Sequence, residues 1–434
     1  MIQVFSTSWA LFLGMFLLMI GNGLQGTLLG LRGEIEGFST FEISLVMSAY
    51  FVGFLGGSQY TPKLIGRVGH VRVFAALGSL ISAVLILYPA LTEPWAWVIG
   101  RVIIGFCFCG VYITAESWLN DASDNTTRGK ALSIYLIVQM AGIVFAQYLV
   151  TVADVGGYVL FIISSVVVSL AFAPVLLSAG KSPDFSSTKP MKIKDLIQAS
   201  PLACTGMFLL GGIFAAQFGM SAVYGRRVDL SVEQISIFVS TIYIAALVLQ
   251  YPIGWLSDRI DRRTLIIFLG LIGGGSAMLA FLADGAYWAI LMSGAVIGGT
   301  SNPLYALLIA YANDYLERED MAAASGGLLF VNGVGAISGP LILGFMMDEI
   351  GPGGYWVFQC IVMTVIGLYA AYRITQRDRT TEDFENVPYA AIPASSTAVI
   401  AEVAQEVYIE AEEEVLADAQ SDATADSDDD GADR

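Results

Sequence analysis

The apolar parts of this chain contain almost no ionisable residues. No Asp or Glu lies near the middle of any long hydrophobic run, and the only histidine, His70, lies in a short polar loop. All four cysteines fall inside apolar runs, where thiols behave as small hydrophobic groups, so we expect no disulfide and no metal site. The sequence has no Gly-x-x-x-x-Gly-Lys-Ser/Thr phosphate loop and no nucleophile paired with a histidine base. We therefore expect no cofactor and no enzyme activity.

Basic residues are also too few to give a positive surface. The net charge is −17, and from Thr380 onward there are 16 acidic residues against one arginine. The preceding 379 residues carry 22 acidic and 20 basic side chains and are nearly neutral. The acidity therefore belongs to the C-terminal tail, and we expect no nucleic-acid partner.

Hydrophobic residues dominate what remains. They make up 56% of the 434 residues, and the mean hydropathy is +0.69. A soluble core of this length cannot bury that much apolar surface, so a lipid bilayer is the expected surrounding. A spanning helix needs about 20 apolar residues. Twelve stretches qualify: 8–30, 41–65, 71–92, 95–118, 129–153, 156–178, 201–225, 231–255, 263–284, 286–312, 322–347 and 353–375.

A polar stretch divides these spans into two sets of six. The sequence therefore predicts an N-terminal six-helix bundle at 1–178, a linker at 179–200, a C-terminal bundle at 201–375 and an acidic tail at 376–434. The tail is low in complexity, and we expect most of it to be disordered. Within it, valine or alanine recurs every fourth residue from Val399 to Val415, which indicates a short amphipathic helix.

Lysine and arginine mark one side of the predicted membrane domain. With the N-terminus in the cytoplasm, 16 of these residues fall in cytoplasmic segments and three, Arg32, Arg226 and Arg227, fall outside. This asymmetry predicts that both termini are cytoplasmic in the plasma membrane. No basic region precedes the first apolar run, so we expect an uncleaved first helix.

The two halves align at a nearly constant offset of 192 to 193 residues. The aligned pairs are Gln25 with Gln217, Tyr50 with Tyr243, Arg67 with Arg259, Asp121 with Asp314 and Gly142 with Gly335. Five such pairs in one register indicate a tandem duplication. The predicted fold is an all-α membrane protein with twelve transmembrane helices in two pseudo-symmetric six-helix bundles.

Two short basic loops lie at that offset, PKLIGRVGHVR from Pro62 and GWLSDRIDRR from Gly254. They resemble the loop G-x-x-x-D-R-x-G-R-R/K of the major facilitator superfamily. The second copy keeps more of that pattern, because in the first copy Pro62, Gly66 and His70 replace its glycine, aspartate and an arginine. The stretches RVGHVRVF, AESWLND and RGKAL are similar to the YcaD-like branch of that family, which has no settled substrate.

The resemblance implies a secondary active transporter that moves a small organic solute by alternating access, a rocker-switch of the two bundles. It also implies a bacterial inner-membrane location, a monomer, and a solute and the bilayer as partners. Coupling to protons is an open alternative, with Glu34, Glu36, Glu116 and Asp258 as candidate groups. The competing hypothesis is a non-transporting sensor or scaffold that recruits a partner through its acidic tail.

A carrier that alternates between two states needs a closure at its cytoplasmic side, and charges at the membrane boundary can provide it. We predict that Glu116 pairs there with Arg67 or Arg72. The alternative is that the basic residues only anchor the loops. The candidate cytoplasmic latch consists of Arg67, Gly69, Arg72, Glu116, Arg128, Gly254, Asp258, Arg259, Arg262 and Arg263.

Polar and aromatic residues inside the spans are candidates for the substrate cavity. Arg101 is the only basic residue well inside a predicted span. A charge there is costly, so we expect it either to serve substrate binding or coupling, or to form a structural pair or reach the membrane interface. For the neutral residues, helix-to-helix hydrogen bonding and packing are the alternatives. The candidates are Asn22, Gln25, Tyr50, Arg101, Gln217, Tyr243, Asn302 and Tyr305. Gly335, Gly339 and Pro340 are predicted to form a helix-packing face.

Overall fold

The computed structural model describes residues 2–123, 127–178, 191–257, 259–376, 397 and 399–409, with side chains from Ser8 onward. Every regular element in these ranges is helical. The helices are α1 (Ile2–Ile35), α2 (Thr40–Val68), α3 (His70–Leu87), α4 (Pro94–Asp121), α5 (Arg128–Val150), α6 (Val159–Ser178), α7 (Ile193–Ala199), α8 (Pro201–Ala215), η1 (Ala216–Met220), α9 (Ser221–Arg227), α10 (Val232–Ser257), α11 (Arg262–Leu282), α12 (Tyr287–Asn313), α13 (Arg318–Glu349) and α14 (Gly354–Ile374).

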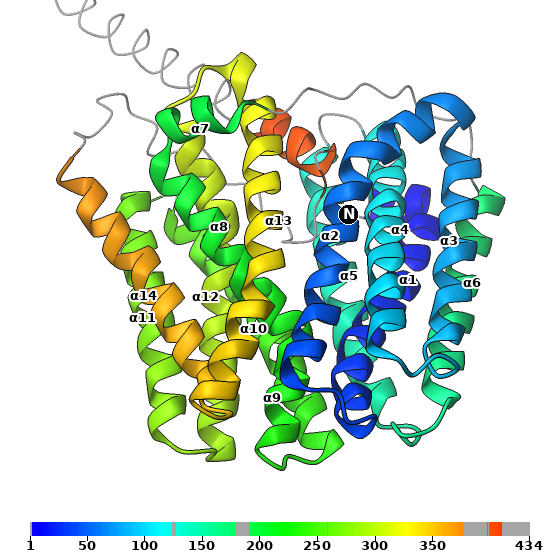
Figure 1. Ribbon diagram of the computed structural model, residues 1–434. Coiled ribbons are helices and arrows are strands. Elements are labelled where there is room, and N and C mark those ends of the chain that lie inside the picture. The colour runs from blue at the N-terminus through cyan, green and yellow to red at the C-terminus, as the bar shows by residue number, and fades with distance from the viewer. Residues whose placement is uncertain are drawn as a thin grey trace, which may run out of the picture.

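Twelve helices in the described part of the chain are long and apolar enough to cross a membrane, which confirms the predicted fold class. Elements α8, η1 and α9 together make the seventh span, Pro201–Arg227. The helix α7 lies in the predicted linker. Figure 1 shows α1–α6 gathered into one bundle and α8–α14 into the other, side by side.

Local sequence signals set several helix ends. Ser39 and Glu42 form a reciprocal capping box at the start of α2, so two backbone N–H groups there are satisfied by side chains. At the end of α2, Gly69 has φ +84°, a conformation that residues with a Cβ rarely adopt. Pro94 and Pro201 begin α4 and α8, where a missing N–H has no cost.

The duplication is visible in how the helices touch. A Cβ added to Gly142 in α5 would lie 2.8 Å from the carbonyl oxygen of Phe16 in α1, and one added to Gly335 in α13 would lie 1.8 Å from that of Phe208 in α8. Phe16 and Phe208 are 192 residues apart. Corresponding glycines therefore let corresponding helix pairs approach to backbone contact in the two bundles.

The remaining packing candidates lie at the same crossing. A Cβ on Gly339 would lie 2.5 Å from the Cα of Gly212 in α8. Pro340 follows inside α13 and is buried. The α8–α13 crossing is therefore closed by glycine on both helices, as small residues permit.

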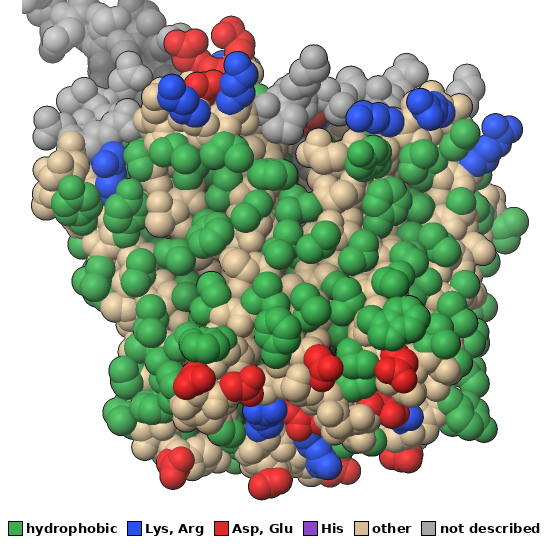
Figure 2. Space-filling model, in the orientation of Figure 1, with side chains coloured by type: hydrophobic (Ala, Val, Ile, Leu, Met, Phe, Trp, Pro, Cys, Tyr) green, Lys and Arg blue, Asp and Glu red, His purple; other side chains and the backbone are tan. Residues whose placement is uncertain are grey.

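We call the end of the molecule that carries α7 the linker face and the opposite end, where α1 turns into α2, the far face (Figure 1). Hydrophobic side chains cover a broad band between the two faces in Figure 2. Lys and Arg gather above this band at the linker face, beside one group of Asp and Glu, whereas Asp and Glu predominate below it. The band is the surface that a bilayer would cover.

Candidate functional site

A polar cluster joins three helices of the N-terminal bundle. Asn22 of α1 donates a hydrogen bond to the hydroxyl of Tyr112 in α4 at 2.9 Å and a longer one to Tyr50 in α2 at 3.4 Å. Gln25 donates to the amide oxygen of Asn22 at 3.0 Å. The Gln25 carbonyl oxygen is buried and has no hydrogen-bond partner among the described residues. The structure thus brings three predicted cavity residues together.

Arg101 lies beside this cluster and is completely buried. Its guanidinium carbon lies 4.8 Å from the ring centre of Tyr50 and 5.8 Å from that of Phe218, which belongs to the other bundle. It donates to the backbone oxygen of Val46 at 3.4 Å and to the sulfur of Met47 at 3.7 Å. Within the described ranges no carboxylate pairs with it, and its Nη1 has no partner. Aromatic faces therefore stabilise this cation in place of a counter-ion.

The C-terminal bundle presents a second, less connected set. Gln217 lies in the π-helical turn η1 and donates to Ser301 of α12 at 3.0 Å. Such a turn widens a helix locally and is common at functional sites. Tyr305 packs on Phe214 at a ring distance of 5.7 Å, and its buried hydroxyl has no partner in the described part of the chain. Asn302 donates to the backbone of Gly298 in its own helix, and Tyr243 is buried in the hydrophobic core.

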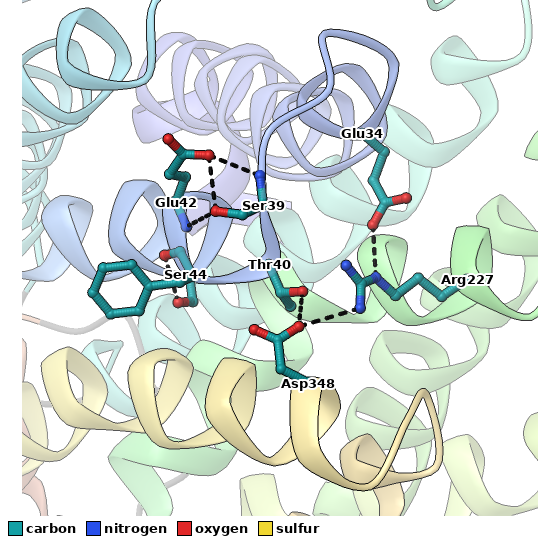
Figure 3. Close-up of polar contacts among 8 residues, drawn as sticks. Glu34, Ser39, Thr40, Glu42, Ser44, Arg227 and Asp348 are labelled. Carbon is teal, nitrogen blue, oxygen red and sulfur yellow. Dashed lines mark hydrogen bonds and ion pairs between the residues drawn. The ribbon is translucent and has the colours of Figure 1, made fainter.

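The far face is closed by a polar group that spans both bundles, which we call the far-face lock: Glu34 of α1, Thr40 of α2, Arg227 of α9 and Asp348 of α13. Arg227 donates through Nε to Glu34 at 3.0 Å and through Nη1 to Asp348 at 3.5 Å. Thr40 donates to the same Asp348 oxygen. Figure 3 shows Arg227 between the two carboxylates. Partly exposed pairs of this kind contribute about 0.2–1 kcal/mol each, so the lock can open.

Close helix contacts lie beneath this lock. A Cβ on Gly344 in α13 would lie 2.7 Å from the hydroxyl oxygen of Ser44 in α2. A Cβ on Gly30 in α1 would lie 3.1 Å from the carbonyl oxygen of Gly219 in η1. Both contacts join one bundle to the other. The bundles therefore touch tightly in the half of the molecule next to the far face.

Several candidate latch residues at the linker face make no contact between the bundles. Arg67 and Arg72 are exposed, and no ion pair to another described residue reaches them. Arg259, in the turn after α10, lies over that helix, with its guanidinium carbon 4.0 Å from the ring centre of Trp255. Gly69 ends α2, and Gly254 is buried in α10. Asp258 lies outside the described residues.

The second basic loop forms ion pairs within its own bundle. Arg262 pairs with Asp314 at the end of α12, and Arg263 pairs with Asp261 at 3.3 Å. Asp314 is the repeat mate of Asp121, and His70 occupies the place of Arg262 in the first copy. Burial raises the pKa of the Asp314 carboxyl to about 6, although the Arg262 charge acts in the opposite direction. The pair is thus a partly desolvated one.

The two remaining latch candidates contact the C-terminal tail. Glu116 of α4 is fully buried and accepts hydrogen bonds from Tyr135 of α5, at 2.9 Å, and from the hydroxyl of Thr397. The expected ion pair with Arg67 or Arg72 is absent from the described residues. Arg128 at the start of α5 pairs with Glu406 at 2.5 Å. Glu116 and Arg128 therefore hold a segment that the sequence placed in a largely disordered tail.

Residues 399–409 form that segment, a helix preceded by Thr397 and here called the tail helix. Figure 1 shows it between α13 and α2 at the linker face. Val403 of the predicted valine stripe is buried, whereas Val399 and Val407 are only partly buried. The aliphatic side chains of Ile400, Val403 and Ala404 pack against the main core. Because an isolated 11-residue helix is marginal in water, these contacts provide most of its stability.

Some contributors had no clear signal in the sequence. Tyr112, Ser301 and Phe218 complete the central clusters, and Thr40 and Asp348 complete the far-face lock. Ser301 could have been found as the neighbour of the candidate Asn302. Nothing in the apolar pattern distinguishes Asp348 from an ordinary residue at a helix end.

The twelve candidate spans in two duplicated bundles define a multi-pass membrane protein, and the comparisons with known proteins make it a transporter. The family model of the Major Facilitator Superfamily matches residues 11–228 and again 202–404. The chain belongs to this superfamily. One similar curated protein is an uncharacterized MFS-type transporter of an Enterobacter strain, which is 24% identical over 77% of this chain and 87% of that protein. Another is the uncharacterized MFS-type transporter YcaD of Escherichia coli, with the same identity and coverage. These relatives are transporters, not enzymes.

Solved structures share the fold at low identity. A mutant of the nucleoside transporter NupG superposes with a TM-score of 0.70 at 15% identity, covering 85% of this chain and all of that one. A bacterial homologue of the human lysosomal transporter Spinster, in an inward-facing and unoccupied conformation, gives 0.65 at 15% identity, covering 94% of this chain and 98% of that one.

Proposed function

We propose that this transporter is a secondary carrier that moves a small organic solute across the bacterial inner membrane by alternating access. In this proposal the linker face and both chain ends are cytoplasmic. The concentration of Lys and Arg at the linker face supports that orientation (Figure 2). The structure then corresponds to an inward-facing state.

The observation that carries the proposal is the unequal closure of the two faces. At the far face, Arg227 joins Glu34 and Asp348, so the bundles are in direct polar contact. At the linker face, a third element, the tail helix, lies between the bundles and contacts both. A pair of rigid bundles that is locked at one end and separated at the other is the arrangement expected of one state of a rocker-switch.

The central clusters support a solute site between the bundles. Gln25 Oε1, Arg101 Nη1 and the Tyr305 hydroxyl are buried polar atoms without partners among the described residues. Each such atom left unpaired costs about 1–3 kcal/mol, which a hydrogen bond with a solute or water would recover, Arg101 donating and Gln25 Oε1 accepting. Aromatic rings surround them, so the fitting solute is an organic molecule with both apolar surface and hydrogen-bonding groups.

Glu116 is the group that would serve proton coupling, if protons drive this carrier. In the described part of the chain it is the one fully buried carboxyl group, and it lies at the gap between the bundles. Titratable groups inside membrane segments commonly serve as proton sites. In the rival scaffold hypothesis the tail recruits a partner, and the described tail helix, being largely buried, would not be available for that contact.

Labelling of a buried position tests the rocking movement without a known substrate. Ser44→Cys, in a chain with all native cysteines replaced by alanine, places a thiol between α2 and α13 beneath the lock. Arg227→Ala removes both ion pairs of the lock, so a membrane-impermeant maleimide added outside the cell should label this thiol about fivefold faster.

The neighbouring Arg226 provides a matched control, because it is exposed and has no ion pair to a described residue. Arg226→Ala removes the same charge and should leave the labelling rate unchanged. Equal rates for the parent and both variants would contradict alternating access through this face. Labelling only from the cytoplasmic side would contradict the orientation.

A further inference from the structure

The tail helix is held by both bundles at once. Thr397 donates its hydroxyl and, at 3.3 Å, its backbone N–H to the Glu116 carboxylate of α4. Glu406 pairs with Arg128 of α5. On the other side, Gln405 accepts from Asn313 of α12 at 2.6 Å and donates to Ser325 of α13 at 2.7 Å. Both polar groups of the Gln405 side chain therefore have a partner in the C-terminal bundle.

Apolar contacts bury the same segment. Ile400, Val403, Ala404 and Tyr408 recur at the spacing of one helix face, and each is at most 4% exposed. The ring of Tyr408 lies 5.8 Å from the guanidinium carbon of Arg262. Ala401 and Gln405 are also buried, so the segment is enclosed on more than one side. A helix lying on an open surface would leave such positions exposed.

The start of the tail helix is fixed by its own sequence. The backbone oxygen of Thr397 accepts from Ala401 N at 3.1 Å, and its hydroxyl oxygen accepts from Val399 N at 3.4 Å. Threonine at an N-cap stabilises a helix in this way. The same hydroxyl reaches Glu116, so formation of the helix and docking on α4 are coupled.

We propose that the cytoplasmic mouth between the bundles is a docking site for residues 397–409 of the same chain, and that this segment must leave the mouth before the bundles can close there. This inference rests on the proposed alternating access. A helix with side chains is about 10–12 Å wide and, at 11 residues, roughly 16 Å long, which is too large to remain in a closing gap.

The chemistry of the site fits this occupant. Arg128 and Arg262 were predicted to form a cytoplasmic latch, and both contact the tail helix. The docked segment thus engages Arg128 through Glu406 and covers Arg262, which keeps its own pair with Asp314. The tail also carries most of the net negative charge of the chain, which attracts it to the basic linker face. Because 20 residues connect Gln376 to Thr397, the segment acts at a high effective concentration and weak contacts suffice.

A reversible cross-link tests docking in the full-length chain. Gln405→Cys and Ser325→Cys replace two side chains in direct hydrogen-bond contact, again in the cysteine-free background. In membranes, mild oxidation should form a disulfide between them. Ala404→Arg places a charged side chain where Ala404 is 2% exposed, and it should abolish this cross-link while the melting temperature of the bundles stays unchanged.

Arg128 and Lys130 give a matched pair for the ionic contact. Arg128→Gln removes the partner of Glu406 and should slow cross-linking about fivefold, whereas exposed Lys130→Gln should not. A disulfide that forms no faster than one between Ser325→Cys and Gln376→Cys would overturn the docking site.

The effect of the tail on the rocking movement is measured as the rate at which the external maleimide labels Ser44→Cys. Ala404→Arg should raise its labelling rate about fivefold, because the mouth can then close and the far face can open. A second variant carries Ser44→Cys together with Gln405→Cys and Ser325→Cys. In it, the disulfide between positions 405 and 325 should suppress labelling of the thiol at position 44, and reduction of that disulfide should restore the labelling. If Arg227→Ala raises labelling but neither Ala404→Arg nor the disulfide changes it, alternating access stands and the tail proposal fails.

Discussion

At the scale of single residues, Arg101 is a buried cation without a carboxylate partner among the described residues. It is fully buried, and aromatic rings, one carbonyl and one thioether are its partners in place of a carboxylate. A buried charge without a counter-ion is retained against its desolvation cost, which points to a use in transport. Its contact with Phe218 also places it where the two bundles meet.

Substitution of Arg101 should therefore separate stability from function. Arg101→Met keeps much of the volume and removes the charge, so it should raise the free energy of unfolding by about 1 kcal/mol and abolish transport. Arg101→Lys keeps the charge but loses the planar stacking on Tyr50, and it should retain part of the activity. Thermal unfolding and uptake of a solute found by a thermal-shift screen are the measurements. A destabilised, active Met variant would refute a transport role.

Asp314 should make stability depend on pH. Its pKa is raised from the usual 3.8 to about 6, so the folded state holds the proton more tightly than the unfolded state. Stability from this group is therefore fully present below about pH 4 and is lost as the pH rises through about 6. Burial is the main cause of this raised pKa and the Asp261 charge adds to it, whereas Arg262 and Tyr408 act in the opposite direction. We expect melting temperatures of the wild type to fall relative to Asp314→Asn over that window; parallel curves would contradict the assignment.

At the scale of helices, glycine determines how closely the elements pack. The backbone of Phe208 fills the place where a Cβ of Gly335 would lie, and a backbone atom cannot move aside as a flexible side chain can. The corresponding place in the other bundle is Gly142 against Phe16. Packing between membrane helices depends on such close approach, because lipid supplies no hydrophobic driving force between them.

Gly335→Ala should accordingly push α13 away from α8. We expect a loss of about 1–3 kcal/mol, the usual cost of overpacking, measured as a lower melting temperature in detergent. Gly275→Ala is the matched control, because nothing lies within 4 Å of the added Cβ, and alanine should stabilise that helix by about 0.5–1 kcal/mol. Equal effects of the two substitutions would show that α8 and α13 do not meet at backbone contact.

The elements that could be predicted were those marked by long apolar runs in the sequence. Hydropathy placed all twelve spans, for example 353–375 against α14 at Gly354–Ile374, because lipid imposes one length and one polarity on each. The π-helical turn at Gln217 and the pairing of Thr397 with Glu116 were not predictable. Both depend on packing between segments far apart in the sequence, which local composition does not encode.

At the scale of the whole molecule, the far-face lock and the docked tail helix favour the same state. The far-face lock uses partly exposed ion pairs, and the tail helix fills the linker face. In the proposed rocking movement, the tail helix has to leave the linker face and the far-face lock has to break before the bundles can close at the linker face and open at the far face. If the bundles move as rigid bodies, as proposed, the hydrophobic core of each stays the same, and a few surface interactions set the free-energy difference between the two states.

A covalent bond across the far-face lock should stop the proposed rocking movement. Thr40 and Asp348 touch across the bundles, so Thr40→Cys with Asp348→Cys should form a disulfide on mild oxidation. The oxidised carrier should bind solute from the cytoplasmic side with unchanged affinity yet fail to move it, because binding needs one open face and transport needs both in turn. Reduction should restore transport, and the single Thr40→Cys variant should be insensitive to oxidation. Transport by the fully cross-linked carrier would show that the bundles do not separate at this face.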